Sequence, residues 1–279
     1  MAVVNHPADG MPIAALQARA LELRRHMLGM ARRMGQGYIG QGLGFADVMA
    51  ALYFSELRYD PKDPAWSDRD RFVMSTGHYS LALWAALAAT GVIGVEELAT
   101  YGADESRLDM STLDTTPGVE VIGGSLGQGF GQAVGMALGL RLDKREARVF
   151  CEFSDGELQE GSTWEAAMAA ASFGLDNLIA LIDCNGIQAD GRVVIEIEPV
   201  AAKMAAFGWV TQEIDGNDMM GIVEALKATR VRGGNPHAIV LRTIPGMGVA
   251  SLVGRERAHF VRIDPGEWDT LAQELETGP

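Results

Sequence analysis

Three short stretches of the sequence place polar or glycine-rich residues directly after an apolar run: 154–156 (SDG), 183–186 (DCNG) and 243–246 (TIPG). Two of them carry hard oxygen donors, the Asp155 carboxylate and the Asn185 side-chain carbonyl. Oxygen ligands of this kind suit Mg2+ and are poor ligands for soft metals. Because Mg2+ takes few protein ligands and completes its coordination with water and phosphate oxygens, this pair predicts a magnesium site.

The residues next to this pair predict a diphosphate site around the metal. The backbone carbonyl of Ile187, just past Asn185, is a candidate third ligand. Gly156 lets the backbone approach a ligand closely and leads into a helix expected to start near Ser162. Free amides at a helix N-terminus favour an anion. Asp-Gly and Asn-Gly are also the commonest turn formers, so spacing alone leaves two ordinary turns as the alternative.

These stretches belong to a regular alternation of strands and helices. Strands, several ending in turns, are expected at 71–76, 147–156, 177–186, 209–215 and 237–246. Helices are expected at 14–34, 45–57, 78–91, 132–142, 162–174, 199–208 and 219–229. Apolar residues at helical spacing predict the helices, and near-continuous apolar runs such as VFCEF and LIALI predict buried strands. Two glycine-studded segments, 35–44 and 123–131, interrupt the pattern.

The alternation predicts the fold class. Strands joined through helices need right-handed crossovers and form a parallel sheet that is covered on both faces. We therefore expect an α/β fold with a doubly wound, mainly parallel sheet and helices on both faces. Ligands of such sheets bind beyond the carboxyl ends of the strands, where the three polar stretches would converge. Residues 14–265 are expected to form one domain, with an N-terminal tail at 1–13 and a C-terminal tail at 266–279.

Composition limits the classes of partner. The chain has 279 residues, of which 48% are hydrophobic and 22% charged, as is ordinary for a protein with a substantial core. Its 23 basic and 37 acidic residues give a net charge of -14, so we expect no binding to nucleic acid or to an anionic membrane. A metal and backbone amides can still make a single site attractive to an anion.

No segment predicts export or membrane insertion. Residues 1–12 lack a basic region followed by an apolar run, so no secretory signal is visible. The longest apolar stretch, Leu81 to Ala89, is too short for a membrane span. Cys151 and Cys184 lie in apolar runs and are expected to be small core residues of a protein in a reducing compartment. We therefore expect a cytoplasmic protein.

Four longer segments carry a more specific signal. They are DRDRFVMSTGHYS (68–80), TPGVEVIGGSLGQGFGQAVGMALG (116–139), SDGELQEGSTWEAAMAAASFGLDNLIALIDCNGIQADG (154–191) and TIPGMGVASLVGRERAHF (243–260). The third is similar to the thiamine diphosphate signature, which begins Gly-Asp-Gly and ends near two asparagines about thirty residues later. In this order the four segments resemble the diphosphate-binding half of the transketolase family, and the resemblance extends over most of residues 20–262.

The resemblance implies thiamine diphosphate and Mg2+ as cofactors, with Ca2+ or Mn2+ as possible substitutes for Mg2+. Asp155, Asn185 and the carbonyl of Ile187 would bind the metal. His78 and His259 would be the catalytic residues, at the diphosphate or the reacting centre. The residues implied at the cofactor are His78, Gly124, Ser125, Leu126, Asp155, Gly156, Glu160, Asn185 and His259.

Some of these implied roles have simpler alternatives. Leu126 would pack against the aminopyrimidine of the cofactor. Glu160 and Glu165 match acidic residues at the family's subunit interface, although acids at a helix start are also stabilised by the helix dipole alone. His78 would otherwise be a polar residue at a helix N-terminus, and His259 a surface histidine among charged residues.

The sequence departs from the family at four positions. Ser154 replaces the first glycine of the signature and Cys184 the first asparagine, and neither change removes an expected metal ligand. Tyr38 stands where transketolases usually have a histidine that touches the substrate, so Tyr38 and His78 are the expected substrate contacts. No histidine occurs in 108–114, where another is expected. The expected cofactor site is intact, whereas the substrate site differs from that for the usual ketose phosphate donors.

Length is the largest departure. A full transketolase is more than twice as long, so the resemblance implies a separate partner subunit that carries the pyrimidine-binding domain and its glutamate, within a heterotetramer. Such an enzyme would transfer a two-carbon ketol unit from a ketose-type donor to an aldehyde acceptor. The alternatives are a subunit of a related acyloin-forming or 2-keto acid decarboxylating carboligase, and a non-catalytic scaffold subunit.

Overall fold

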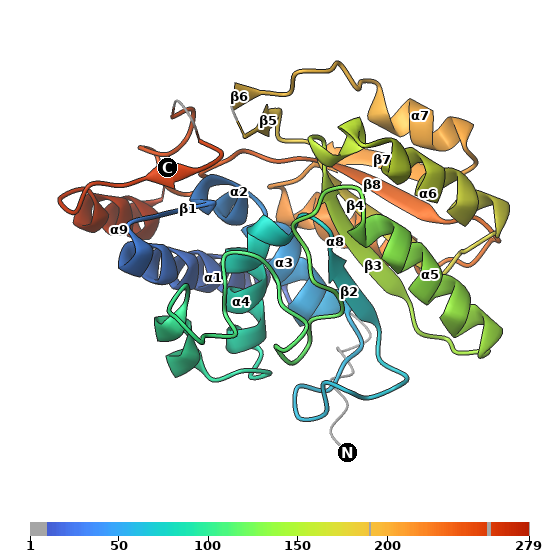
Figure 1. Ribbon diagram of the computed structural model, residues 1–279, viewed down its shortest axis with the longest axis horizontal. Helices are drawn as coiled ribbons and strands as arrows, with labels where there is room; N and C mark the ends of the chain where they lie inside the picture. Colours follow the sequence, from blue (N-terminus) through green and yellow to red (C-terminus); the bar gives the residue numbers. More distant parts are fainter. Residues whose placement is uncertain (1–9, 190, 256–257, 279) are drawn as a thin grey trace.

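The centre of the molecule is a five-stranded parallel sheet (Figure 1). The computed structural model describes residues 10–189, 191–255 and 258–278. The strands lie in the order β2-β3-β4-β8-β7, and all four pairings are parallel. Their bounds are β2 (Arg71–Met74), β3 (Val149–Ser154), β4 (Leu178–Asp183), β7 (Val210–Asp215) and β8 (His237–Arg242). The predicted parallel sheet is confirmed, with each of the five strands in the expected place.

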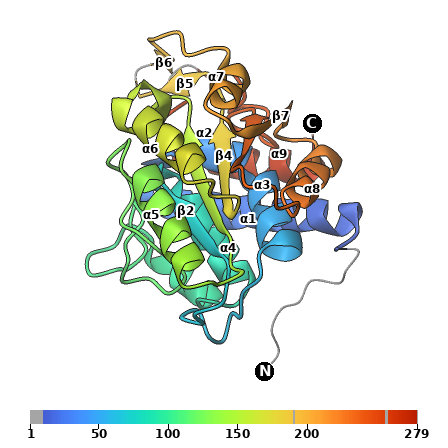
Figure 2. The same cartoon turned by 90° about the vertical axis from the view of Figure 1, so that its right-hand side faces the viewer.

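Helices cover both faces of the sheet, as expected (Figures 1 and 2). One face packs against α1 (Ile13–Met34), α3 (Ala46–Ala51), α4 (Ser80–Ala89) and α8 (Met219–Ala228). The other face packs against α5 (Gly129–Leu142), α6 (Gly161–Ser172) and α7 (Val200–Ala206). Short turns complete the set: a π-helical turn at Leu52–Glu56 and 3-10 turns at Gly77–Tyr79, Val95–Thr100 and Glu157–Gln159. Within the described ranges, no helix has the length and apolar character needed to cross a membrane.

Alternate side chains of the central strands enter the two cores separately. Phe150 of β3 and Leu181 of β4 pack in the core that contains α1 and α4. Phe153 of β3 and Ile182 of β4 pack in the core that contains α5 and α6. Successive residues of a strand point to opposite faces, and here both faces are covered. This is why β3 and β4 are buried along their whole length and read as near-continuous apolar runs.

Two short strand pairs and a short helix border the carboxyl end of the sheet. β1 (Gln36–Gly37) pairs antiparallel with β9 (Val261–Arg262), and β5 (Ile187–Gln188) pairs antiparallel with β6 (Gly191–Arg192). The helix α2 (Ile39–Gly44) follows β1 and packs against α1, α3 and α4. The first glycine-studded segment is therefore a short strand and a short helix rather than an interruption without regular structure.

The C-terminal residues differ from the expected tail. Residues 268–277 form α9 (Trp268–Thr277), which packs against α1 through the buried side chains of Trp268, Leu271 and Leu275. The spacing of these three residues gives a short helix one apolar side, which α1 covers. At the other end of the chain, residues 1–9 of the predicted N-terminal tail lie outside the described residues.

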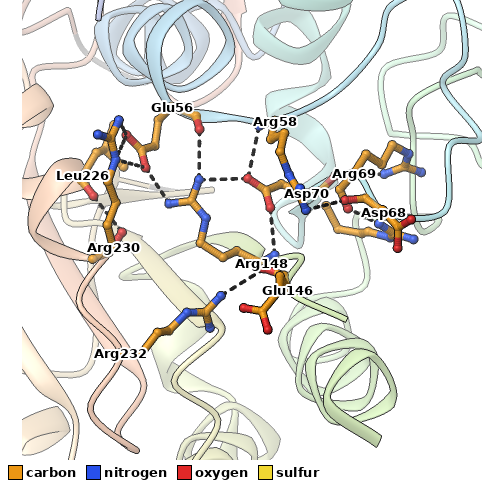
Figure 3. Close-up of polar contacts among 12 residues, drawn as sticks. Glu56, Arg58, Asp68, Arg69, Asp70, Glu146, Arg148, Leu226, Arg230 and Arg232 are labelled. Carbon is orange, nitrogen blue, oxygen red and sulfur yellow. Dashed lines mark hydrogen bonds and ion pairs between the residues drawn. The ribbon is translucent and has the colours of Figure 1, made fainter. Parts of the chain in front are cut away.

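A buried network of charges closes the amino ends of the strands (Figure 3). Arg148, just before β3, donates to Glu56 at 2.5 Å and to Asp70 at 2.8 Å, and Arg230 donates to Glu56 at 2.8 Å. The Glu56 and Asp70 side chains are only 2% exposed. Burial alone would lower the pKa of Arg148, but Asp70 and Glu56 raise it overall. The network joins chain segments at the end of the sheet opposite the polar stretches.

Candidate functional site

The turns that carry Asp155 and Asn185 lie side by side at the carboxyl edge of the sheet. β3 and β4 are in register up to their last residues, and the amide of Asp155 donates to the carbonyl of Asp183 at 2.9 Å. The Asp155 carboxylate accepts hydrogen bonds from the amides of Gly156 at 2.8 Å and Gly186 at 2.6 Å. The two turns therefore converge as expected from a parallel sheet.

A buried carboxylate holds the side chain of Asn185 in one orientation. Asn185 Nδ2 donates to Asp183 Oδ2 and to the Tyr79 hydroxyl, both at 2.8 Å. Asp183 is fully buried and also accepts hydrogen bonds from Tyr79 at 2.7 Å and from Thr243. Because the amide nitrogen faces this carboxylate, the Asn185 carbonyl oxygen faces away from it and accepts from the amide of Ile187 at 3.0 Å. This oxygen has a second lone pair for a cation.

The donors on these turns fit Mg2+. In the part of the chain that the structure describes, no group of three or more His, Cys, Asp or Glu side chains is placed to hold a metal. The donors are instead the Asp155 carboxylate, the Asn185 amide carbonyl and the backbone carbonyl of Ile187, an all-oxygen set that suits Mg2+ with added water or phosphate. Burial, followed by the charge of Asp183, raises the pKa of Asp155 to about 7. A divalent cation would favour its ionised form.

A cavity of about 240 Å³ lies beside these turns. It is lined by six residues that the sequence places at the metal or cofactor: His78, Leu126, Gly156, Glu160, Ile187 and His259. Asp155 and Asn185 line a second hollow of about 370 Å³. Gly124 and Ser125 precede Leu126 in its loop but do not line the first cavity, and Glu165 is exposed on α6. The fold thus gathers most of the expected residues from distant parts of the chain.

Three rings pack together here, and two of them, those of His78 and His259, line the cavity. The ring centroids are 4.6 Å apart for Tyr38 and His78, 5.0 Å for His78 and His259, and 5.3 Å for Tyr38 and His259. Burial, with a smaller effect of His259, lowers the pKa of His78 to about 3, so this imidazole is neutral near pH 7. Among the described residues, His78 Nε2 is buried without a hydrogen-bond partner. The expected substrate contact Tyr38 therefore packs against both expected catalytic histidines.

Glu157, to which the sequence pattern assigns no role, fixes the loop that carries Leu126. Its carboxylate is fully buried and accepts hydrogen bonds from the amide of Gly127 at 3.0 Å and from the Ser75 hydroxyl. Burial raises the pKa of Glu157 to about 7, although the hydrogen bonds from Ser75 and Gly127 act in the opposite direction. The only local feature that could have indicated a role for Glu157 is its place two residues after Asp155. The sequence does not predict its contact with the loop of Leu126.

Comparison with known proteins relates this arrangement to a family. Residues 17–277 match the family model described as transketolase, thiamine diphosphate binding domain. The chain is 50% identical over 268 residues to a transketolase family protein of Sinorhizobium fredii, covering 95% of this chain and 96% of that protein. It is 39% identical over 264 residues to the 6-deoxy-6-sulfo-D-fructose transketolase subunit of a Clostridium species, covering 94% and 96%. It is 35% identical over 251 residues to one subunit of the apulose-4-phosphate transketolase of Phocaeicola vulgatus, covering 89% of each chain.

Solved transketolases share the fold. The transketolase from Campylobacter jejuni superposes with a TM-score of 0.89 at 31% identity, covering 96% of this chain and 43% of that chain. The transketolase from Leishmania mexicana superposes with a TM-score of 0.86 at 28% identity, covering 96% and 42%. The chain therefore spans less than half the length of these solved transketolases. Because the family model matches most of the chain and the three relatives align along nearly all of it, this chain belongs to the transketolase family and corresponds to its thiamine diphosphate-binding domain.

Proposed function

We propose that this chain is the diphosphate-binding subunit of a two-chain transketolase-like enzyme that depends on thiamine diphosphate and Mg2+. The enzyme transfers a two-carbon ketol unit from a ketose-type donor to an aldehyde acceptor. The observation that carries the proposal is the meeting of the Asp155 and Asn185 turns beside the cavity lined by His78, Leu126 and His259. Membership of the transketolase family supports the class of reaction.

In this proposal the two turns hold the metal and the diphosphate. Asp155, Asn185 and the carbonyl of Ile187 bind Mg2+, and Asp183 keeps the Asn185 carbonyl oxygen available by binding the amide nitrogen. Gly156 lines the cavity and precedes the turn Glu157–Gln159, and because it has no side chain it lets a diphosphate approach the backbone closely. The metal therefore supplies the main counter-charge to the diphosphate in a site that is otherwise rich in carboxylates.

The remaining cavity residues orient the cofactor and keep water out. Thiamine diphosphate, when bound, supplies the carbanion-stabilising chemistry. Neutral His78 donates one hydrogen bond and accepts another without adding charge, and His259 lies beside it at the reacting centre. Leu126 provides an apolar wall for the aminopyrimidine, with Gly124 and Ser125 in the loop that positions it.

The partner subunit is proposed to carry the pyrimidine-binding domain. Two relatives named as transketolase subunits align with this chain over 96% and 89% of their own lengths. Among the described residues that line the cavity, Glu160 is the one glutamate, and it directly precedes α6. The glutamate that protonates the pyrimidine is therefore proposed to come from the partner, with Glu160 and Glu165 at the interface of a heterotetramer that holds two sites.

Tyr38 favours a second candidate for the reaction. Its ring lies against both His78 and His259, at the position where the family usually has a substrate-binding histidine. A related acyloin-forming or 2-keto acid decarboxylating carboligase would use the same cofactor site with another donor. A screen of donors separates the two candidates. The screen should include 2-keto acids, 6-deoxy-6-sulfo-D-fructose and apulose 4-phosphate. The names of two relatives contain the last two compounds.

The proposal is tested by purifying the chain with its natural partner and measuring cofactor binding and turnover. The complex is expected to bind thiamine diphosphate by calorimetry only when Mg2+ is present, and to transfer ketol units, whereas the isolated chain shows little turnover. Asp155→Ala should abolish the metal-dependent binding. Asp143→Ala, at the exposed end of α5, is the control and should bind normally.

Three outcomes would decide against parts of the proposal. Robust turnover by the isolated chain would contradict the two-chain enzyme. Unchanged cofactor affinity in Asp155→Ala would contradict the metal assignment. Cofactor binding by the complex without turnover of any donor in the screen would favour the scaffold subunit instead.

A further inference from the structure

The glycines of α2 allow a distant segment of the chain to approach it closely. A Cβ atom at Gly40 would lie 2.7 Å from the carbonyl oxygen of Ala258, and one at Gly44 would lie 2.8 Å from the carbonyl oxygen of Ile244. The carbonyl of Gly40 also accepts a hydrogen bond from the amide of Gly246 at 2.8 Å. Since no larger residue fits at Gly40 without a shift of this segment, the glycine determines how near the following residue, His259, comes to α2.

Gln41, the next residue of α2, meets His259 directly. Gln41 Nε2 and His259 Nδ1 are 2.5 Å apart, and Gln41 is only 1% exposed. The His259 ring also lies 5.3 Å from the ring of Tyr38 and 5.0 Å from the ring of His78. The imidazole is therefore held by a buried amide at one nitrogen and by two rings, while it lines the cavity.

The orientation of the Gln41 amide decides which nitrogen of His259 carries the proton. Among the described residues, the buried Gln41 Oε1 has no hydrogen-bond partner. In the observed orientation the amide leaves its oxygen and one of its two N–H groups unpaired, whereas the reversed amide would leave both N–H groups unpaired. Orphaned buried N–H groups are rarer than under-satisfied carbonyls, so the amide nitrogen is the atom that faces His259. An Nδ1 that accepts this hydrogen bond requires a neutral ring with its proton on Nε2.

We propose that Gln41 is a positioning residue that holds His259 in the neutral tautomer with the proton on Nε2. Nε2 lies across the ring from the Gln41 contact. His259 is then a hydrogen-bond donor to an oxygen atom in the cavity, and not a base that removes a proton. This proposal rests on the proposed function in one respect: the oxygen atom that accepts the hydrogen bond belongs to the cofactor or to a carbonyl substrate.

The test is nitrogen-15 NMR of the full-length chain with labelled histidine, in which His259→Asn identifies the signals of His259. The wild-type chain is expected to show an unprotonated Nδ1 and a protonated Nε2 in the His259 ring near pH 7. A protonated Nδ1 in the wild-type chain would overturn the proposal, because Gln41 would then accept the hydrogen bond.

Two variants test whether Gln41 causes this state. Gln41→Glu can no longer donate to the ring, so the proton should move to Nδ1. Gly40→Ala displaces the 258–260 segment and should leave a mixture of both tautomers. His237, which contacts the carbonyl of Val231 at the amino end of β8, is the internal control and should keep its signals. His259 signals that stay as in the wild type in Gln41→Glu would refute a positioning role.

Turnover of the complex with the partner gives an independent measurement. Gln41→Leu should lower kcat/KM about fivefold, the order expected for the loss of one hydrogen bond, and Gln41→Glu should change the shape of the pH profile as well. An unchanged kcat/KM in both variants would contradict the role in catalysis. The NMR result does not depend on turnover, so a complex without transketolase activity would refute the proposed function while leaving the assignment of the tautomer intact.

Discussion

Asn185 donates a hydrogen bond from Nδ2 to Asp183 Oδ2 at 2.8 Å, and this contact decides which end of the amide is turned toward the proposed metal. Asp183 is held in turn by hydrogen bonds from Tyr79 and Thr243. Burial raises the pKa of Asp183, while the hydrogen bonds from Thr243 and Tyr79 lower it. A reversed Asn185 amide would place its carbonyl oxygen against a carboxylate oxygen, and two acceptors cannot satisfy each other. The ligand oxygen is therefore oriented before any metal binds.

Replacing Asp183 should weaken metal binding even though Asp183 is not a proposed ligand. In Asp183→Asn, the side chain at 183 no longer offers two acceptors to Asn185, Tyr79 and Thr243, so the Asn185 amide is free to turn. Loss of such a supporting group costs about 10- to 100-fold in metal affinity. Calorimetric titration of Mg2+ in the presence of thiamine diphosphate measures it. Thr243→Val removes one donor to Asp183 and is the milder control. Equal Mg2+ affinities of Asp183→Asn and the wild type would contradict the orienting role of Asp183.

Glu152 should make the stability of the chain depend on pH. This residue of β3 is fully buried, accepts one hydrogen bond from the amide of Thr76 at 3.3 Å, and has no partner for Oε1 among the described residues. Burial first, and then the charge of Glu157, raise its pKa well above 4.5. The folded chain therefore binds more protons than the unfolded chain above pH 4.5, and stability from this group falls as pH rises, by up to about 1.4 kcal/mol per pH unit.

Glu152→Gln removes this dependence because glutamine does not titrate and can still accept from Thr76. The variant is expected to match the wild type near pH 4.5, the ordinary pKa of the carboxyl, and to become progressively more stable than the wild type as the pH rises. Urea unfolding at a series of pH values measures the difference. A difference in stability that stays constant across the series would show that Glu152 is ionised in the folded chain.

Breaking the charge network at the amino end of the sheet should destabilise the fold. Arg148→Met leaves the carboxylates of Glu56 and Asp70 buried without their central partner (Figure 3). Removal of one member of a buried ion pair typically costs about 3–5 kcal/mol, which a shift of the urea midpoint would measure. Arg232→Met is the control, because its ion pair with Asp176 is 3.5 Å long and about a third exposed, and such pairs contribute about 0–1 kcal/mol. Similar losses in the two variants would contradict the importance of burial.

Tyr38 should influence the choice of donor. Its phenol ring packs against His78 at 4.6 Å and His259 at 5.3 Å, so a smaller ring with a hydrogen-bonding nitrogen would change the surface that a substrate meets. Tyr38→His is expected to shift the donor preference of the complex toward common ketose phosphates. Tyr38→Phe keeps the ring and removes only the hydroxyl, which separates packing from hydrogen bonding. A donor profile that is the same in Tyr38→His and the wild type would count against Tyr38 as a substrate contact.

Some parts of the site were predictable because they depend on local sequence. The turn-forming Asp155-Gly156 and Asn185-Gly186 pairs follow buried strands, and parallel strands end at one edge of a sheet. Their meeting therefore follows from the pattern alone. The roles of Glu157 and Gln41 do not, because each acts on a residue far away in the chain: Glu157 on Gly127, and Gln41 on His259.

By itself, the sequence determined the alternation of strands and helices, the parallel sheet and the set of oxygen donors at its edge, since periodicity and turn chemistry are properties of short segments. It did not reveal that 268–277 is a packed helix, because the spacing of Trp268, Leu271 and Leu275 gives so short a segment an apolar side without showing what covers it, and α1 provides that surface. Only the tertiary structure decided which way the Asn185 amide points and which nitrogen of His259 meets Gln41. Both depend on the alignment of buried donors and acceptors from separate elements, and packing alone creates that alignment.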